Sequence, residues 1–145
     1  MASVIGLAIT PKIMAPMELR DAVTISIDDG IDGDARGRKR KRQVSILFED
    51  DWTDAVAETG DAIHWSERRA NIFVRGMRSP QVEDGVFTIG NVQLRVAMET
   101  DPCEVMEGLR AGLRKSMTPN WRGGVCCVVV SGGDIAIGDA VEYSD

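Results

Sequence analysis

Short apolar segments rich in β-branched residues, each ended by turn-forming residues, constrain the fold of this chain more than any other feature. Val, Ile and Thr pack well on a pleated sheet, and apolar–polar alternation is typical of a strand with one buried face. Gly90-Asn91 lies between two such segments and favours a tight hairpin turn. The pattern predicts strands at residues 3–9, 22–27, 43–48, 70–74, 86–89, 92–98, 124–130, 134–137 and 140–143. Many short strands with few helices predict a barrel or a sandwich.

Two segments follow a helical pattern instead. Residues 50–58 begin with acidic side chains, which suit a helix N-terminus, and end before Gly60. After Pro102, apolar residues recur at near-helical spacing as far as Leu113. A length of 145 residues is the commonest size of one domain. We therefore expect a single domain over residues 1–145, mainly β with a few short helices.

Composition excludes several classes of protein. The longest apolar run, residues 125–130, is far shorter than the roughly 20 residues that cross a bilayer. Residues 1–9 lack the basic flank and long apolar region of a secretory signal, so they predict a first strand. Three cysteines, an odd number, show no disulfide spacing. We expect a cytoplasmic protein without a membrane partner.

Metal-binding and histidine-dependent chemistry find little support. Cys126 and Cys127 are adjacent in a predicted strand, where their side chains point to opposite faces. The chain has no Cys-x-x-Cys pair and a single histidine, His64, which argues against zinc and against Ser-His-Asp or Cys-His catalysis. Residues 28–34 resemble a calcium loop, but Lys39 stands where an EF-hand needs a bidentate carboxylate, so a glycine turn is the better interpretation.

Positive charge is concentrated in one run. Residues 36–42 (RGRKRKR) hold six of the 17 basic residues, so the rest of the chain holds 11 basic and 23 acidic residues. Such runs are most often solvated surface loops; the functional alternatives are an anion-binding rim and a nucleic-acid patch. The acidic remainder and the lack of interleaved aromatic residues argue against nucleic acid. A phosphate-bearing small ligand fits better.

Cys103 is the best placed of the three thiols to react. It directly follows Pro102 and is expected in the first turn of a helix, where unpaired N–H groups favour the thiolate that binds metals and carries sulfur. The acidic neighbours Asp101, Glu104 and Glu107 oppose this effect. By itself, a cysteine at a helix start is more often an inert small hydrophobic residue.

Two further positions suggest anion binding. Arg69 and Asn71 open a predicted strand, and a guanidinium fork beside an amide suits an oxyanion or a phosphate. The alternative is a surface arginine and an asparagine that bonds its own turn. Asp34 directly precedes the basic run, so it could orient that loop or a bound ligand.

An ordered set of short motifs resembles the MOSC domain, the C-terminal domain of molybdenum cofactor sulfurases, which also occurs as short stand-alone bacterial proteins. The resemblance runs from about residue 9 to residue 143. Its motifs are Gly30-Ile31-Asp32-Gly33-Asp34, Arg42-Gln43-Val44, Arg69-Ala70-Asn71-Ile72-Phe73-Val74, Ile89-Gly90, Asp101-Pro102-Cys103-Glu104, Arg122-Gly123-Gly124-Val125 and Ile137-Gly138-Asp139.

The resemblance implies a closed or partly open β-barrel, of the type found in MOSC and pyruvate-kinase barrel domains, with an essential cysteine in a pocket. In members that bind molybdenum cofactor, that cysteine is a thiolate ligand of the metal, and basic and amide groups hold the pterin phosphate. The family's cysteine corresponds to Cys103, as both catalytic residue and metal ligand. The cofactor-binding positions correspond to Lys12, Gly33, Asp34, Gln43, Arg69 and Asn71.

Three hypotheses of function remain open. In the first, the protein binds molybdenum cofactor (molybdopterin) and reduces N-oxygenated small molecules with electrons from a redox partner. In the second, Cys103 carries a persulfide received from a cysteine desulfurase, for maturation of metal–sulfur cofactors. The third is a non-catalytic small-anion binding module that uses Lys12, Arg69 and the basic loop. Pyridoxal phosphate serves the larger sulfurases, and this chain lacks their aminotransferase-like domain, so we do not expect it here.

Overall fold

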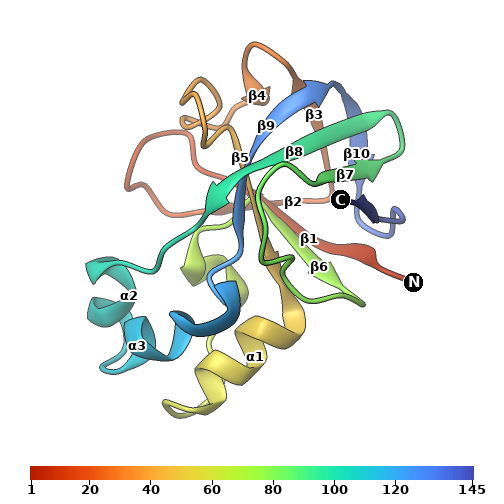
Figure 1. Cartoon of the computed structure of the whole chain (residues 1–145). Coiled ribbons are helices and arrows are strands. Elements are labelled where there is room, and N and C mark those ends of the chain that lie inside the picture. Colours follow the sequence, from red (N-terminus) through yellow and green to blue (C-terminus); the bar gives the residue numbers. More distant parts are fainter.

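The computed structural model describes residues 1–145 and is built mainly from strands (Figure 1). The strands are β1 (Ser3–Ile9), β2 (Glu18–Arg20), β3 (Ala22–Ser26), β4 (Gly30–Ile31), β5 (Val44–Phe48), β6 (Ile72–Arg75), β7 (Val86–Ile89), β8 (Val92–Glu99), β9 (Val125–Ser131), β10 (Gly133–Ala136) and β11 (Glu142–Ser144). Every predicted strand overlaps one of these, whereas β2 and β4 were not predicted.

The strands form two sheets. One sheet has eight strands in the order β11-β7-β8-β9-β5-β6-β1-β2, and the other has the order β10-β3-β4. The first sheet does not close on itself, because its order ends at β11 and β2. Apolar residues from both sheets, such as Ile25 and Val129, meet in one buried core. The fold is therefore mainly β, as predicted, and compatible with a partly open barrel.

Local sequence accounts for two of the strand connections. Ile89 pairs with Val92 across Gly90-Asn91, and Gly90 has a φ of +59°, which glycine adopts without strain. Neighbours β5 and β6 are parallel, so a crossover must join them. Helix α1 (Glu49–Ala57) lies in that crossover and overlaps the predicted helix over residues 50–58.

The predicted second helix is broken in two. Helix α2 (Glu104–Leu109) and helix α3 (Leu113–Met117) are separated at Arg110, whose backbone is extended, and Gly112, whose φ is +87°. The sequence predicted Cys103 inside the first turn of this helix, and that prediction is wrong. Cys103 directly precedes the first turn, with an extended backbone and no capping bond from its side chain. No helix in the structure has the length and apolar character needed to cross a membrane.

The helices gather at one end of the molecule, below the strands in Figure 1. Helices α1, α2 and α3 share a second buried cluster with one face of β5 and β6, in which Trp52, Phe73 and Met106 pack together. Two short 3₁₀ turns, Trp65–Arg68 and Pro119–Trp121, precede β6 and β9. This arrangement places Cys103 close to the chain segments that enter β6 and β9.

Candidate functional site

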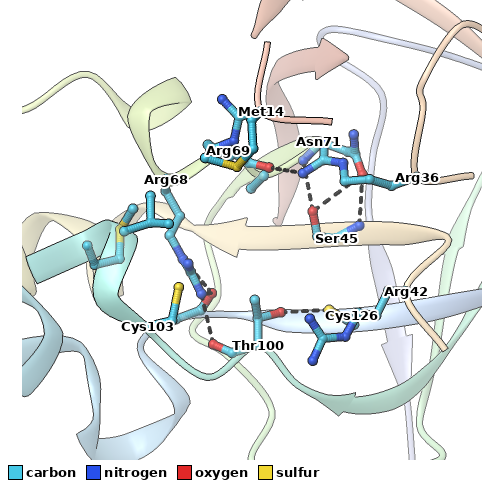
Figure 2. Close-up of a pocket in the computed structure, with 14 residues that line it drawn as sticks. Met14, Arg36, Arg42, Ser45, Arg68, Arg69, Asn71, Thr100, Cys103 and Cys126 are labelled. Atoms are coloured by element: carbon cyan, nitrogen blue, oxygen red, sulfur yellow. Dashed lines mark hydrogen bonds between the residues drawn. The ribbon is translucent and has the colours of Figure 1, made fainter. Parts of the chain in front are cut away.

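Cys103, Arg69 and Asn71 line one cavity, together with side chains from distant parts of the sequence (Figure 2). The lining comes from the loop before β2, the basic loop (residues 36–42), β5, the segment that enters β6, the β8–α2 connection, the first turn of α2 and the start of β9. The hollow measures about 740 Å³ when the space open to solvent at its mouth is included. We call it the Cys103 pocket.

The charge of the Cys103 pocket is opposite to that of the protein. Four arginines line it, and no aspartate or glutamate does, although the chain has a net charge of −6. A concave site with cations of one sign focuses the electrostatic field on anions. The four arginines are Arg36, Arg42, Arg68 and Arg69.

Arg68 is the most deeply buried of these arginines, with 8% of its surface exposed. Its Nη2 donates to the Thr100 carbonyl at 2.8 Å, and its Nε donates to the Gly123 carbonyl at 3.2 Å. Burial lowers the pKa of Arg68, and the nearby Cys126, Cys103 and Asp101 oppose that shift. No carboxylate forms an ion pair with this guanidinium, so its charge is held in the pocket wall without a directly bonded counter-ion.

Arg69 is held by a backbone geometry that an ordinary residue seldom adopts. Its φ is +69°, in the left-handed region, directly after the 3₁₀ turn at residues 65–68. Its Nη2 donates to the Ala15 carbonyl and its own carbonyl accepts from Arg36 Nη1, both at 2.7 Å. Burial lowers the pKa of Arg69, and so does the charge of Arg36. Arg69 therefore joins two loops at the edge of the pocket.

Asp34 orients the first arginine of the basic loop, as the sequence suggested. Its side chain is fully buried and accepts five hydrogen bonds, three of them from Arg36. The other two donors are Thr10 N at 2.9 Å and Asn71 Nδ2 at 3.3 Å. Because this carboxylate is fixed from several sides, it fixes Arg36 in turn.

Asn71 forms its hydrogen bonds within the protein. Nδ2 donates to the Ala8 carbonyl at 3.1 Å as well as to Asp34, and Oδ1 accepts from Ser45 N at 3.0 Å. Figure 2 shows this cluster beside Arg36 on one side of the pocket, while Arg68 extends toward Thr100 and Cys103 on another. The amide thus ties β1 and β5 to the start of β6 beside the pocket.

The remaining predicted positions lie outside the pocket lining. Lys12 and Gly33 are exposed, and Gly33 has a φ of +85° in the turn before Asp34. Gln43 is buried, and its Nε2 donates to the carbonyls of Ile27 and Gly37 while its Oε1 accepts from Val129 N. Gln43 therefore anchors the base of the basic loop to the barrel.

Sequence reasoning gave no role to two residues that line this site, Arg68 and Cys126, whereas it named the basic loop that contains Arg42 as a possible anion-binding rim. Cys126 lies 4% exposed in the pocket wall with its Sγ 3.1 Å from Thr100 Oγ1, while Cys127 points into the main core. Strand alternation correctly separated the two cysteines but did not say which one faced the pocket. The sequence did hold a signal for Arg68, because it is adjacent to Arg69 just before a predicted strand. Adjacent side chains there point in different directions, so either arginine of the pair could have faced the site.

The three thiols are expected to react in a fixed order. Cys103 is exposed, Cys126 is 4% exposed and Cys127 is fully buried, and burial raises the pKa of Cys127. Only a thiolate attacks an alkylating reagent, so a raised pKa removes the reactive form near neutral pH. Iodoacetamide, followed by peptide mass spectrometry, should label Cys103 first and Cys127 only after unfolding. Labelling of Cys127 as fast as Cys103 in the folded protein would contradict the described burial.

Comparison with known proteins gives one family and several structures. The family model described as MOSC domain matches residues 32–142. The crystal structure of the YuaD protein from Bacillus subtilis is similar with a TM-score of 0.80 and 21% identity, covering 99% of this chain and 96% of that one. YiiM from Geobacillus stearothermophilus has a TM-score of 0.71 and 12% identity, covering 99% of this chain and 73% of that one. YiiM from Escherichia coli has a TM-score of 0.67 and 14% identity, covering 99% of this chain and 70% of that one. At these identities the structures support the fold, and no curated protein matches the chain.

Proposed function

This chain belongs to the MOSC domain family, and we propose that its Cys103 pocket binds molybdenum cofactor and serves the reduction of N-oxygenated small molecules. One observation carries the proposal: an exposed cysteine lies in a pocket lined by four arginines and no carboxylate. A soft thiolate suits a transition metal, and arginine forks suit phosphate and oxyanion groups. Family membership alone does not supply this combination.

The residues present fit such a cofactor. No group of three or more His, Cys, Asp or Glu side chains could hold a metal ion by itself, so protein side chains alone do not form a metal centre. Cys103 would supply one sulfur ligand, and the remaining ligands would come with the cofactor. Arg68, buried without a directly bonded counter-ion, would face an anionic group of that cofactor. No lysine lines the pocket, so it offers no Schiff-base partner for pyridoxal phosphate.

The chain's own residues divide the work of binding. When bound, the cofactor would supply a redox centre for a two-electron reduction, in which the N–O bond of the substrate breaks, two protons are taken up and the oxygen leaves as water. Arg68 and Arg36 are held by fixed hydrogen bonds, so they present their charge at little cost in side-chain entropy. Arg42 is exposed at the mouth and can meet an incoming anion. Met14 and Val105 line the mouth with apolar surface, which helps to exclude water.

A second candidate function rests on the same thiol. Cys103 is the only exposed cysteine, and no lysine, histidine or carboxylate accompanies it in the pocket. A persulfide carrier needs an accessible thiol and no second catalytic group. In this case a cysteine desulfurase would deliver the sulfur atom to Cys103.

Metal analysis after expression in a cofactor-producing host tests the proposal. The purified protein should contain molybdenum, and Arg68→Gln should lower its content about tenfold or more, because a charge-assisted hydrogen bond contributes about 1.5–3 kcal/mol. Arg75→Gln is the matched control, since Arg75 is exposed and pairs with Glu49 on another face. A folded protein that stays free of molybdenum after loading would refute the proposal. A sulfur adduct on Cys103 after incubation with a cysteine desulfurase would then favour the carrier.

A further inference from the structure

The basic loop has a rigid base. Arg36 is fixed by Asp34 and by the Arg69 carbonyl, and Arg38 pairs with Asp29 at 2.9 Å. Gln43 Nε2 holds the Gly37 carbonyl at 3.1 Å. Hydrogen bonds and ion pairs therefore fix the first residues of the loop to the rest of the protein.

The tip of the same loop carries charges without partners. Side chains of residues 39–42 form no hydrogen bond and no ion pair, and all four are exposed. They line a second, shallow hollow together with Met98. Its volume is about 960 Å³ when the space open to solvent is included. Arg42 lines both this hollow and the Cys103 pocket, so the basic tip (residues 39–42) continues the mouth of that pocket.

Adjacent unpaired cations repel one another, and the protein could have relieved that repulsion with its many carboxylates. Outside the loop the chain holds 11 basic and 23 acidic residues, yet none of those carboxylates pairs with the tip. A partner with an acidic surface would relieve the repulsion. The electrostatic field would steer it to this face and away from the acidic remainder of the protein surface.

The surroundings of the mouth suit a protein partner. Met14 is 66% exposed and Val105 is 41% exposed, and both line the Cys103 pocket. Exposed apolar side chains beside a charged border are the usual composition of a protein–protein contact. No aromatic residue lines either hollow, so stacking platforms for nucleic-acid bases are absent.

We propose that the basic tip is the docking surface for an acidic protein that delivers electrons to the Cys103 pocket. The inference rests on the proposed function, because the proposed reduction needs an electron donor from outside the chain. A donor bound at residues 39–42 would cover the mouth of the pocket, since Arg42 belongs to both surfaces. Docking at this place would bring the donor's redox group to the mouth of the Cys103 pocket.

A fluorescent polyglutamate peptide serves as the probe, with binding measured by anisotropy at low and high salt. We expect salt-sensitive binding that weakens about tenfold or more in Lys39→Glu/Lys41→Glu. Arg114→Glu/Lys115→Glu on α3 makes the same change of charge at exposed positions and should change binding far less. Saturating peptide should also slow iodoacetamide labelling of Cys103.

Three outcomes would overturn the proposal. The first is an equal loss of binding in both double variants, which would reflect net charge alone. The second is unchanged labelling of Cys103 with bound peptide, which would place the contact away from the mouth. The third is tighter binding of a single-stranded DNA oligonucleotide of equal charge, which would identify a nucleic-acid surface.

Molybdenum loading of Lys39→Glu/Lys41→Glu, whose changed residues lie outside the Cys103 pocket, should match the wild type. The peptide could bind through the basic tip even if the protein never took up molybdenum. That result would refute the proposed binding of molybdenum cofactor but not the docking surface.

Discussion

Cys103→Ser is expected to lose its molybdenum, with content in purified protein falling about tenfold or more, the scale on which changes around a metal alter affinity. Serine keeps the size of the side chain but replaces a soft sulfur donor with a hydroxyl that stays protonated near neutral pH. Because Cys103 is exposed and forms no hydrogen bond through its side chain, the fold should be unaffected. Metal analysis and thermal unfolding, measured on the same preparation, separate these two effects.

Cys127→Ala is the control for this experiment. Cys127 is buried in the main core and points away from the pocket, so its loss should lower stability slightly and leave molybdenum in place. Equal metal content in Cys103→Ser and wild type would refute the ligand role of Cys103. If affinity for inorganic phosphate also stayed unchanged, the third hypothesis, a non-catalytic small-anion binding module, would gain support.

Asp34→Ala is expected to lower the free energy of unfolding by about 3 kcal/mol or more, because breaking a buried ion pair leaves a charge without its partner. The carboxylate has no exposed surface and holds Arg36, Asn71 and the Thr10 amide at once. Urea unfolding, followed by tryptophan fluorescence, measures the change. The same substitution should weaken phosphate binding, since Arg36 loses the group that orients it in the pocket.

Asp29→Ala is the matched control, because Asp29 also pairs with an arginine of the basic loop. That pair is exposed on both sides, and such pairs contribute about 1 kcal/mol or less. A stability loss of the same size in both variants would show that burial of Asp34 is not what makes its ion pair strong.

The sequence by itself determined the elements that depend on local chemistry. Alternating β-branched segments and the Gly90-Asn91 turn predicted the strands, since each strand's pattern reflects its own buried face. The ordered motifs predicted the family, and the pocket then united Cys103 with Arg69 and Asn71. The second helix was predicted too long, because the break at Gly112 is a backbone event that apolar spacing does not report.

Only the tertiary structure decided what surrounds the cysteine. Arg42, Arg68 and Cys126 reach the pocket from the basic loop, the 3₁₀ turn before β6 and strand β9. Residues so far apart in the chain meet because β9, β5 and β6 are neighbours in one sheet, and local sequence carries no information about that pairing. The tertiary structure also determines that the side-chain amides of Gln43 and Asn71 donate to carbonyls inside the protein. It buries Arg68 against backbone carbonyls without a directly bonded counter-ion. The sequence therefore selected Cys103 as the candidate, and the fold placed four arginines around it.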